Sequence, residues 1–191
     1  MGRKPRVSIP YCFYHIVCRG NRRDPLFMHD GDFATFLYIL KKLHEKYHFE
    51  IASFCLMSNH YHLQLRSQYH SISSIMALIN KKYADYYNNR HNLTGHVYEK
   101  RFFDEVILSK KGMLEVSRYI HLNPVAASMV EKPEDYPWSS YQYFVDTEYD
   151  KQNLPFFDPH IILNEFPGTL DERKEQYEMY HLVETASTKK V

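Results

Sequence analysis

The chain has 191 residues and a formal net charge of +1, and 44% of its residues are hydrophobic, which is enough for a folded core. It contains no run of about 18 apolar residues, so a membrane-spanning helix is excluded. No apolar stretch of signal-peptide type follows the first residues, and the number of cysteines is odd. We therefore expect a cytoplasmic protein with reduced thiols.

The charge is divided unevenly along the chain. The first 111 residues contain 17 Lys and Arg against 9 Asp and Glu, whereas the remainder contains 7 against 14. A basic part followed by an acidic part is typical of nucleic-acid binding, although solvated surface charge gives the same count. Aromatic residues make up 16% of the chain, and their rings can stack on unpaired bases as well as fill a core.

The predicted elements follow one another without an internal repeat. Aromatic, β-branched and apolar runs predict strands at residues 11–19, 50–57, 61–65 and 102–108. Apolar residues at helical spacing predict helices at 30–48, 71–90 and 110–122, the last one stopped by Asn123 and Pro124. The order βαββαβα predicts an α+β, ferredoxin-like fold, in which an antiparallel sheet has two helices on one face and its other face is free for a ligand.

Residues 131–191 are expected to form a mostly helical extension that packs on the preceding domain at 1–130. Pro133 to Trp138 are typical of a turn-rich crossover. Thr169 and Glu172 have the spacing of a capping box, which predicts a short helix running to about Glu184.

His60 and His62 are the most informative pair in the chain. In a strand, residues i and i+2 point to the same face, so both imidazoles would project from one side of the sheet, where neutral imidazole can bind a metal ion. On the helix at 110–122, Tyr119 and Asn123 would be neighbours at i and i+4. This set suggests metal-assisted phosphoryl transfer, although histidines and tyrosines in such patterns can also be ordinary surface or core residues.

Four segments occur in the order typical of a known family. They are residues 14–21 (YHIVCRGN), 56–62 (LMSNHYH), 95–102 (GHVYEKRF) and 118–124 (RYIHLNP), with PEDYPWSSY following at 133–141. From about Tyr11 to Phe144 the chain resembles the REP-associated tyrosine transposases, within the His-hydrophobe-His superfamily of single-strand DNA transposases. It departs from the family where the hydrophobe is Tyr61 and where Ser58 replaces the usual proline.

The resemblance implies a transposase that cleaves and rejoins single-stranded or hairpin (REP-like) DNA, with residues 1–130 as its catalytic domain. Tyr119 would attack the scissile phosphate and form a 5′-phosphotyrosine, leaving a free 3′-OH. His60, His62 and Asn123 would hold one divalent ion, and this mixed nitrogen and oxygen set suits Mg²⁺ or Mn²⁺. Some relatives exchange the tyrosine helix between subunits, but the long extension after it leads us to expect a monomer here.

Several polar and basic residues are candidates for contact with DNA phosphates: Arg19, Asn21, Arg22, Arg23, Lys100 and Arg101, with Lys81 and Lys82 of similar status. Gly20 would let the backbone approach a phosphate closely. The alternative is a basic loop that binds nothing.

Tyr119 has to lose its proton before it attacks, because a phenol titrates near pH 10. The candidates to promote this loss are Lys110, Lys111, Arg118 and a metal-bound water, and the sequence favours none of them. His121 is offset by about 200° around the helix and is expected to face away. His15, on the first strand, is expected to be structural.

Two other classes of function remain open at this stage. The ferredoxin-like fold is also that of RNA-binding domains, so the chain can be a non-catalytic single-stranded nucleic-acid-binding module, although the glycine-aromatic signature of those domains is absent. The third class is a metal-dependent phosphodiester hydrolase that uses His60, His62 and a water nucleophile.

Overall fold

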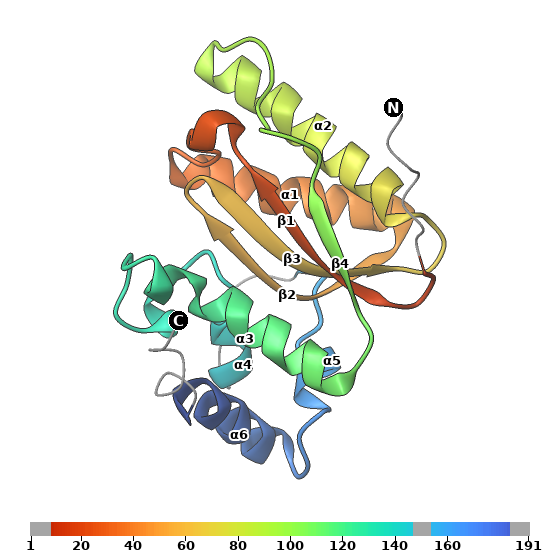
Figure 1. Ribbon diagram of the computed structural model, residues 1–191, viewed down its shortest axis with the longest axis vertical. Coiled ribbons are helices and arrows are strands. Elements are labelled where there is room, and N and C mark those ends of the chain that lie inside the picture. The colour runs from red at the N-terminus through yellow and green to blue at the C-terminus, as the bar shows by residue number, and fades with distance from the viewer. Residues whose placement is uncertain (1–8, 147–153, 184–191) are drawn as a thin grey trace.

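A computed structural model describes residues 9–146 and 154–183 (Figure 1). The strands are β1 (Phe13–Arg19), β2 (Phe49–Met57), β3 (His60–Ser67) and β4 (Phe103–Ile107). The longer helices are α1 (Asp30–Tyr47), α2 (Ile72–His91), α3 (Lys110–Ala126) and α6 (Leu170–Val183), and the short helical turns are η1 (Asn21–Arg23), η2 (Pro133–Asp135), α4 (Gln142–Val145) and α5 (His160–Leu163). The predicted order of elements is confirmed, whereas Glu184 lies outside the described residues.

The four strands form one antiparallel sheet in the order β2-β3-β1-β4. The two central strands, β1 and β3, are thus separated in the chain by a helix and by the edge strand β2. This is the split pairing of a ferredoxin-like fold, so the predicted fold class is confirmed.

The main core lies between the sheet and the pair α1 and α2. Alternate residues of the central strands point to this face, and Ile16 and Leu63 are fully buried there. They pack with Phe36 and Leu40 of α1 and with Ile79 of α2. Burial of one such side chain stabilises the fold by about 1.5–3 kcal/mol.

The opposite face of the sheet is half covered, so the prediction of a free face was wrong. The helices α3, α4, α5 and α6 lie below the sheet in Figure 1; α3 and α5 contact β2, and α6 packs behind them on α4 and α5. β2 is apolar on both faces, and an apolar face has to be buried against another element. Ile120 of α3 packs on Cys55 and Met57, whereas the other half of this face remains accessible, with Phe103 of β4 50% exposed.

The helix α3 also continues past the predicted stop at Asn123 and Pro124, to Ala126. A proline removes one N–H donor from the helix ladder. Here the buried Pro124 lies close to the helix end, and the N–H of Ala127 still donates to the Asn123 carbonyl at 3.0 Å. One missing hydrogen bond therefore does not end the helix, and Asn123 keeps a helical position.

Two expectations about the whole chain can be compared with the described residues. None of their helices combines the length and the apolar character needed to cross a bilayer. Cys12, Cys18 and Cys55 are all free thiols, as predicted.

Asp32 is a buried carboxylate that closes the start of α1. It accepts hydrogen bonds from the backbone N–H groups of Met28 (2.8 Å) and His29 (3.1 Å) and from the Tyr86 hydroxyl (2.9 Å). His91 Nε2 lies 3.2 Å from the same carboxylate. Burial by itself would raise the pKa of Asp32, but these hydrogen bonds outweigh it and lower the pKa below its ordinary value.

We expect Asp32→Asn to reduce the free energy of unfolding at neutral pH by about 1–3 kcal/mol, because the new amide N–H would face groups that donate. The folded pKa lies below the unfolded value of about 3.9, so the carboxylate stabilises the fold above that value. This contribution is lost as the pH falls through the folded pKa. The urea unfolding curves of wild type and Asp32→Asn should differ at neutral pH and converge at acidic pH.

The control is Asp30→Asn, which changes an exposed carboxylate in the same helical turn. A loss of stability as large in this control as in Asp32→Asn would contradict the role given to Asp32.

Candidate active site

The two histidines of the sequence motif lie at the start of β3, directly after the turn at Ser58 and Asn59. Both point to the face covered by α3, and their ring centroids are 5.0 Å apart. Tyr61, between them, points into the main core and is fully buried. Tyr61, which stands at the hydrophobe position of the motif, therefore fills the core. The alternation of side chains along the strand brings the two imidazoles together, as predicted.

The helix α3 brings Tyr119 and Asn123 to this pair. Asn123 Oδ1 lies 3.2 Å from His60 Nε2. The Tyr119 ring lies edge-on to His62, with 5.5 Å between centroids, and 54% of the tyrosine is exposed. A half-buried amide oxygen and an accessible phenol thus share one edge of the helix, at the i and i+4 spacing that the sequence predicted.

The hydrogen bonds of His60 leave two acceptors facing each other. Its Nδ1 lies 2.7 Å from Asn59 Oδ1, an oxygen assigned by the bond from Asn59 Nδ2 to the Arg23 carbonyl. His60 Nδ1 must then carry the proton, which leaves the lone pair of Nε2 in a neutral ring. This lone pair faces the carbonyl-type oxygen of Asn123, and a cation between them would satisfy both.

His62 has the same arrangement with a different partner. Its Nδ1 lies 3.0 Å from His15 Nε2, and the two rings are stacked. The buried Nε2 of His62 has no hydrogen-bond partner among the described residues. If Nδ1 donates to His15, the Nε2 lone pair is free to bind an ion. From the sequence, His15 was predicted to be structural, and its contact with His62 was not foreseen.

The three imidazoles share an environment that keeps them neutral. Burial lowers the pKa of His60 and His15 and lowers that of His62 well below its usual range. The Asn123 oxygen partly offsets this effect at His60, and Glu105 partly offsets it at His15. Neutral imidazole is the form that binds metal ions.

The residues that could hold such an ion are therefore two imidazoles and one amide. Within 9–146 and 154–183, no group of three or more His, Cys, Asp and Glu side chains is arranged as a metal site. The amide oxygen of Asn123 takes the third place instead. Its chemistry fits a hard divalent ion, which prefers oxygen ligands and tolerates imidazole.

Beside these side chains lies a groove of about 600 Å³ between α3, β1 and β4. Tyr119 and Asn123 line one side of it. Arg19, Lys100 and Arg101 give it positive charge, which Glu99 and Glu105 partly offset. Three of the residues predicted to contact DNA thus lie together at the site.

The other predicted DNA contacts lie elsewhere. Asn21 lines a second cavity. Arg22 and Arg23 line neither this cavity nor the groove, and both arginines have a left-handed backbone conformation in the turn η1. A Cβ atom at Gly20 would collide with the backbone oxygen of Asp24. Gly20 is therefore required by the fold of its own turn, and the close approach of a phosphate to its backbone stays a prediction.

The three side chains considered for the activation of Tyr119 do not line its groove. Lys110 pairs with Glu165 and Lys111 with Glu115, near the start of α3. Arg118 lies over the ring of Tyr180, 5.7 Å from its centroid. The structure therefore favours none of them as the group that promotes loss of the phenolic proton.

A buried chain of hydrogen bonds holds α3 in place from behind. His121 faces away from the groove, as predicted, and its Nδ1 and Nε2 lie 2.6 Å from the Tyr177 hydroxyl and 2.7 Å from Ser140 Oγ. Tyr177, on α6, also lies 2.7 Å from Ser117 Oγ, and Ser140 Oγ accepts from the N–H of Phe54 at 2.9 Å. These contacts connect α6 through α3 to strand β2.

Comparison with known proteins adds independent information. Residues 8–123, more than half of the chain, match the family described as "Transposase IS200 like". A relative from Haemophilus influenzae that bears the name of a REP-associated tyrosine transposase is 24% identical over 147 residues, which are 71% of this chain and 82% of that protein. The resemblance predicted from four sequence segments is thereby confirmed.

A solved structure supports the fold as well. A REP-associated tyrosine transposase bound to a REP hairpin superposes with a TM-score of 0.65 at 20% identity. The likeness covers 89% of this chain and 93% of that one, so it includes most of the C-terminal extension.

We expect Tyr177→Phe to lower the free energy of unfolding by about 1–3 kcal/mol, because the loss of one hydroxyl leaves buried polar atoms of His121 and Ser117 without their partner. Chemical denaturation measures the change. Tyr69→Phe removes a hydroxyl from a 73% exposed tyrosine and is the matched control. Equal stability of Tyr177→Phe and wild type would show that this network does not hold α3.

Proposed function

The chain belongs to the family of IS200-like transposases, and from this premise we propose that it cleaves and rejoins single-stranded or hairpin DNA through a 5′-phosphotyrosine at Tyr119. The observation that carries this proposal is the position of one accessible phenol beside three convergent acceptors, His60 Nε2, His62 Nε2 and Asn123 Oδ1.

In the cleavage step, the Tyr119 oxygen forms a bond to the phosphorus while the bond from phosphorus to the 3′ oxygen breaks. The phenol gives up its proton, and the departing 3′ oxygen takes one up, so that a free 3′-OH results. The energy of the phosphodiester is kept in the phosphotyrosine. A 3′-OH of a second DNA end can reverse the step and rejoin the strand without another source of energy.

We propose Mg²⁺ or Mn²⁺ as the cofactor, held by His60, His62 and Asn123. A divalent ion supplies charge neutralisation and orientation of the scissile phosphate. The protein's own part is to keep both imidazoles neutral and to fix their tautomers, His60 through Asn59 and His62 through His15.

The proposed DNA partner follows from the groove. Arg19, Lys100 and Arg101 can contact the phosphates of a strand whose scissile bond lies against Tyr119. The groove opens on the uncovered half of a sheet face, which suits a single DNA strand next to a hairpin. The structural relative described above was solved with a REP hairpin, which supports the same choice of substrate.

We further propose a monomer with its site built within one chain. The tyrosine helix packs on the sheet of its own chain, where Tyr119 contacts His62, and the contact of Tyr177 with His121 ties this helix to the extension. Residues 1–130 then act as the catalytic domain, and residues 131–191 are the extension that holds α3.

We expect Tyr119→Phe to abolish the covalent protein–DNA adduct and strand cleavage, because no other phenol of the described residues lines the groove at the convergent acceptors. DNA affinity should be nearly unchanged, because it depends on phosphate contacts and base stacking. The assay is incubation with a labelled hairpin from the DNA flanking the gene, followed by denaturing electrophoresis. Cleavage without an adduct would indicate a hydrolase, and binding without cleavage by wild type would indicate a binding module.

The same assay tests the monomer. A mixture of Tyr119→Phe with the double variant His60→Ala and His62→Ala should stay inactive, because each copy lacks one half of its site. Recovery of cleavage in the mixture would mean that the tyrosine acts on the site of another copy.

We expect His15→Phe to weaken Mn²⁺ binding by about 10–100-fold, because a ligating histidine depends on the partner of its second nitrogen. Calorimetric titration measures the affinity without any DNA. His15→Gln keeps an acceptor and should bind more tightly than His15→Phe. Tyr119→Phe is the control, with affinity as in wild type.

Two outcomes would contradict this account in different ways. Equal Mn²⁺ affinity of His15→Phe and wild type would contradict only the role of His15 and would leave the metal site standing. Equal affinity of wild type and the His60→Ala, His62→Ala double variant would remove the metal site itself.

A further inference from the structure

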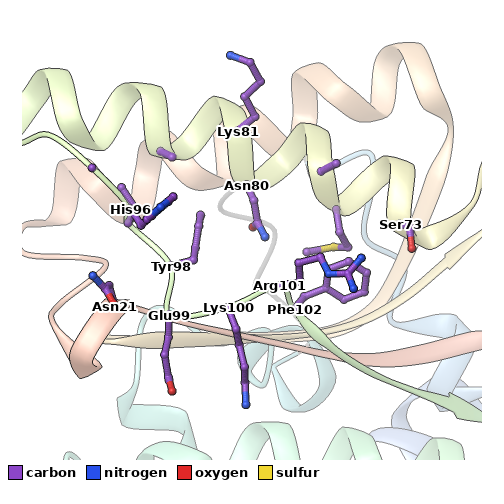
Figure 2. A pocket seen from close by; sticks show the side chains of 15 residues that line it. Asn21, Ser73, Asn80, Lys81, His96, Tyr98, Glu99, Lys100, Arg101 and Phe102 are labelled. Carbon is purple, nitrogen blue, oxygen red and sulfur yellow. The ribbon is translucent and has the colours of Figure 1, made fainter. Parts of the chain in front are cut away.

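A second cavity, of about 690 Å³, lies between α2 and the segment at residues 95–102 that leads into β4 (Figure 2). It borders the main core, to which Met76, Val97 and Phe102 belong, and opens to solvent. None of the side chains proposed to carry the reaction lines it, so the chemistry at Tyr119 leaves its role unexplained.

Among the polar residues that line this cavity, Asn80 is half-buried and points from α2 toward the segment in Figure 2. Its Oδ1 accepts a hydrogen bond from the buried Tyr61 hydroxyl, and its Nδ2 donates to Cys18 Sγ at 3.1 Å. An amide has two N–H groups and two acceptor positions. The core therefore fixes the orientation of Asn80 and leaves one donor and one acceptor for a ligand.

The walls around Asn80 are mostly apolar. Met76, Ala84 and Val97 line them with aliphatic side chains, and Tyr98 and Phe102 line them with rings, of which Tyr98 is the more exposed. Such walls suit a planar aromatic ligand, which can stack on a ring while its edge meets the amide.

The cavity and the groove at Tyr119 lie on either side of one segment, which forms the border between them. Glu99, Lys100 and Arg101 of this segment line both. In Figure 2, Glu99 and Lys100 point away from α2, whereas Tyr98 stands on the side of Asn80. A strand that leaves the groove across Lys100 and Arg101 would thus bring its next bases to the cavity.

We propose that this cavity binds one unpaired nucleobase of the DNA strand that lies in the groove, with Asn80 as the group that reads its edge. The inference rests on the proposed function, because that function supplies the single strand. The donor and acceptor of Asn80 match a base edge, and the basic side chains at the border match the adjoining phosphates.

The chemistry of the cavity favours a base over an isolated phosphate. Its positive charges, on Lys81, Lys100 and Arg101, belong to residues with exposed side chains, and Lys81 is paired with Asp85 at 2.7 Å. The interior offers an amide and rings, which would leave a phosphate without charge compensation. A phosphate belongs at the border and a base belongs inside.

The test combines removal of bases with filling of the cavity. The substrate is a hairpin with a single-stranded flank, taken from the DNA next to the gene, with an abasic site placed at each flank position in turn. The variants are Ala77→Trp and Ser73→Trp, two exposed positions one turn apart on α2 that line the cavity. Asn89→Trp, at an exposed position of α2 that lines neither cavity, is the control.

For wild type and Asn89→Trp, one flank position should be sensitive, with about 5- to 100-fold weaker binding when its base is removed, the effect of one lost stacked base. In Ala77→Trp and Ser73→Trp the intact flank should bind weakly, and removal of the same base should have no further effect. The proposal would be overturned if removal of a flank base did not weaken binding to wild type, or if it still weakened binding to both filled variants.

The adduct at Tyr119, measured on the same proteins, separates this inference from the proposed function. Adduct formation together with unchanged base sensitivity in the filled variants would reject the base site and leave the reaction standing. Loss of base sensitivity in the filled variants without any adduct in wild type would reject the reaction and keep the base site.

Discussion

The packing of α3 against β2 is the contact on which the arrangement of the site depends. Ile120 is fully buried among Cys55, Met57 and Tyr136, on a face of the sheet that an isolated ferredoxin-like unit would expose. The burial of one such side chain is worth about 1.5–3 kcal/mol. Because Tyr119 precedes Ile120 directly, the same contact that buries the isoleucine directs the tyrosine to the edge of the helix. The position of the phenol is thus decided by an aliphatic residue.

The local geometry of the site could be predicted from the sequence, because it depends on short-range periodicity. The two-residue repeat of a strand put His60 and His62 on one face, and the helical repeat put Tyr119 and Asn123 on one edge. The covered face could not be predicted, since it depends on contacts between α3 and strands about sixty residues earlier. His15 was missed for a related reason: its place follows from the pairing register of β1 with β3, in which Val17 opposes His62. Register depends on the whole sheet and is not visible in a single strand.

The helix end expected at Pro124 and the structural need for Gly20 were misjudged or missed for a common reason. Both residues were interpreted by what they do to an isolated backbone. In the folded chain, Pro124 is buried and costs α3 a single donor, while Gly20 avoids a collision with Asp24. Tertiary packing therefore decides whether a helix ends at a proline and where a turn requires a glycine.

The location of the two halves of the site on different elements has a consequence for local unfolding. The histidines belong to β3, a central strand that is hydrogen-bonded on both sides, whereas Tyr119 and Asn123 belong to a helix at the outer layer, held by α6. Central strands open only with global unfolding, while outer helices can open separately at lower free energy. Amide hydrogens of β3 should therefore exchange with solvent more slowly than those of α3. A sub-global fluctuation of this kind would displace Tyr119, the proposed nucleophile, while the histidines stay in place.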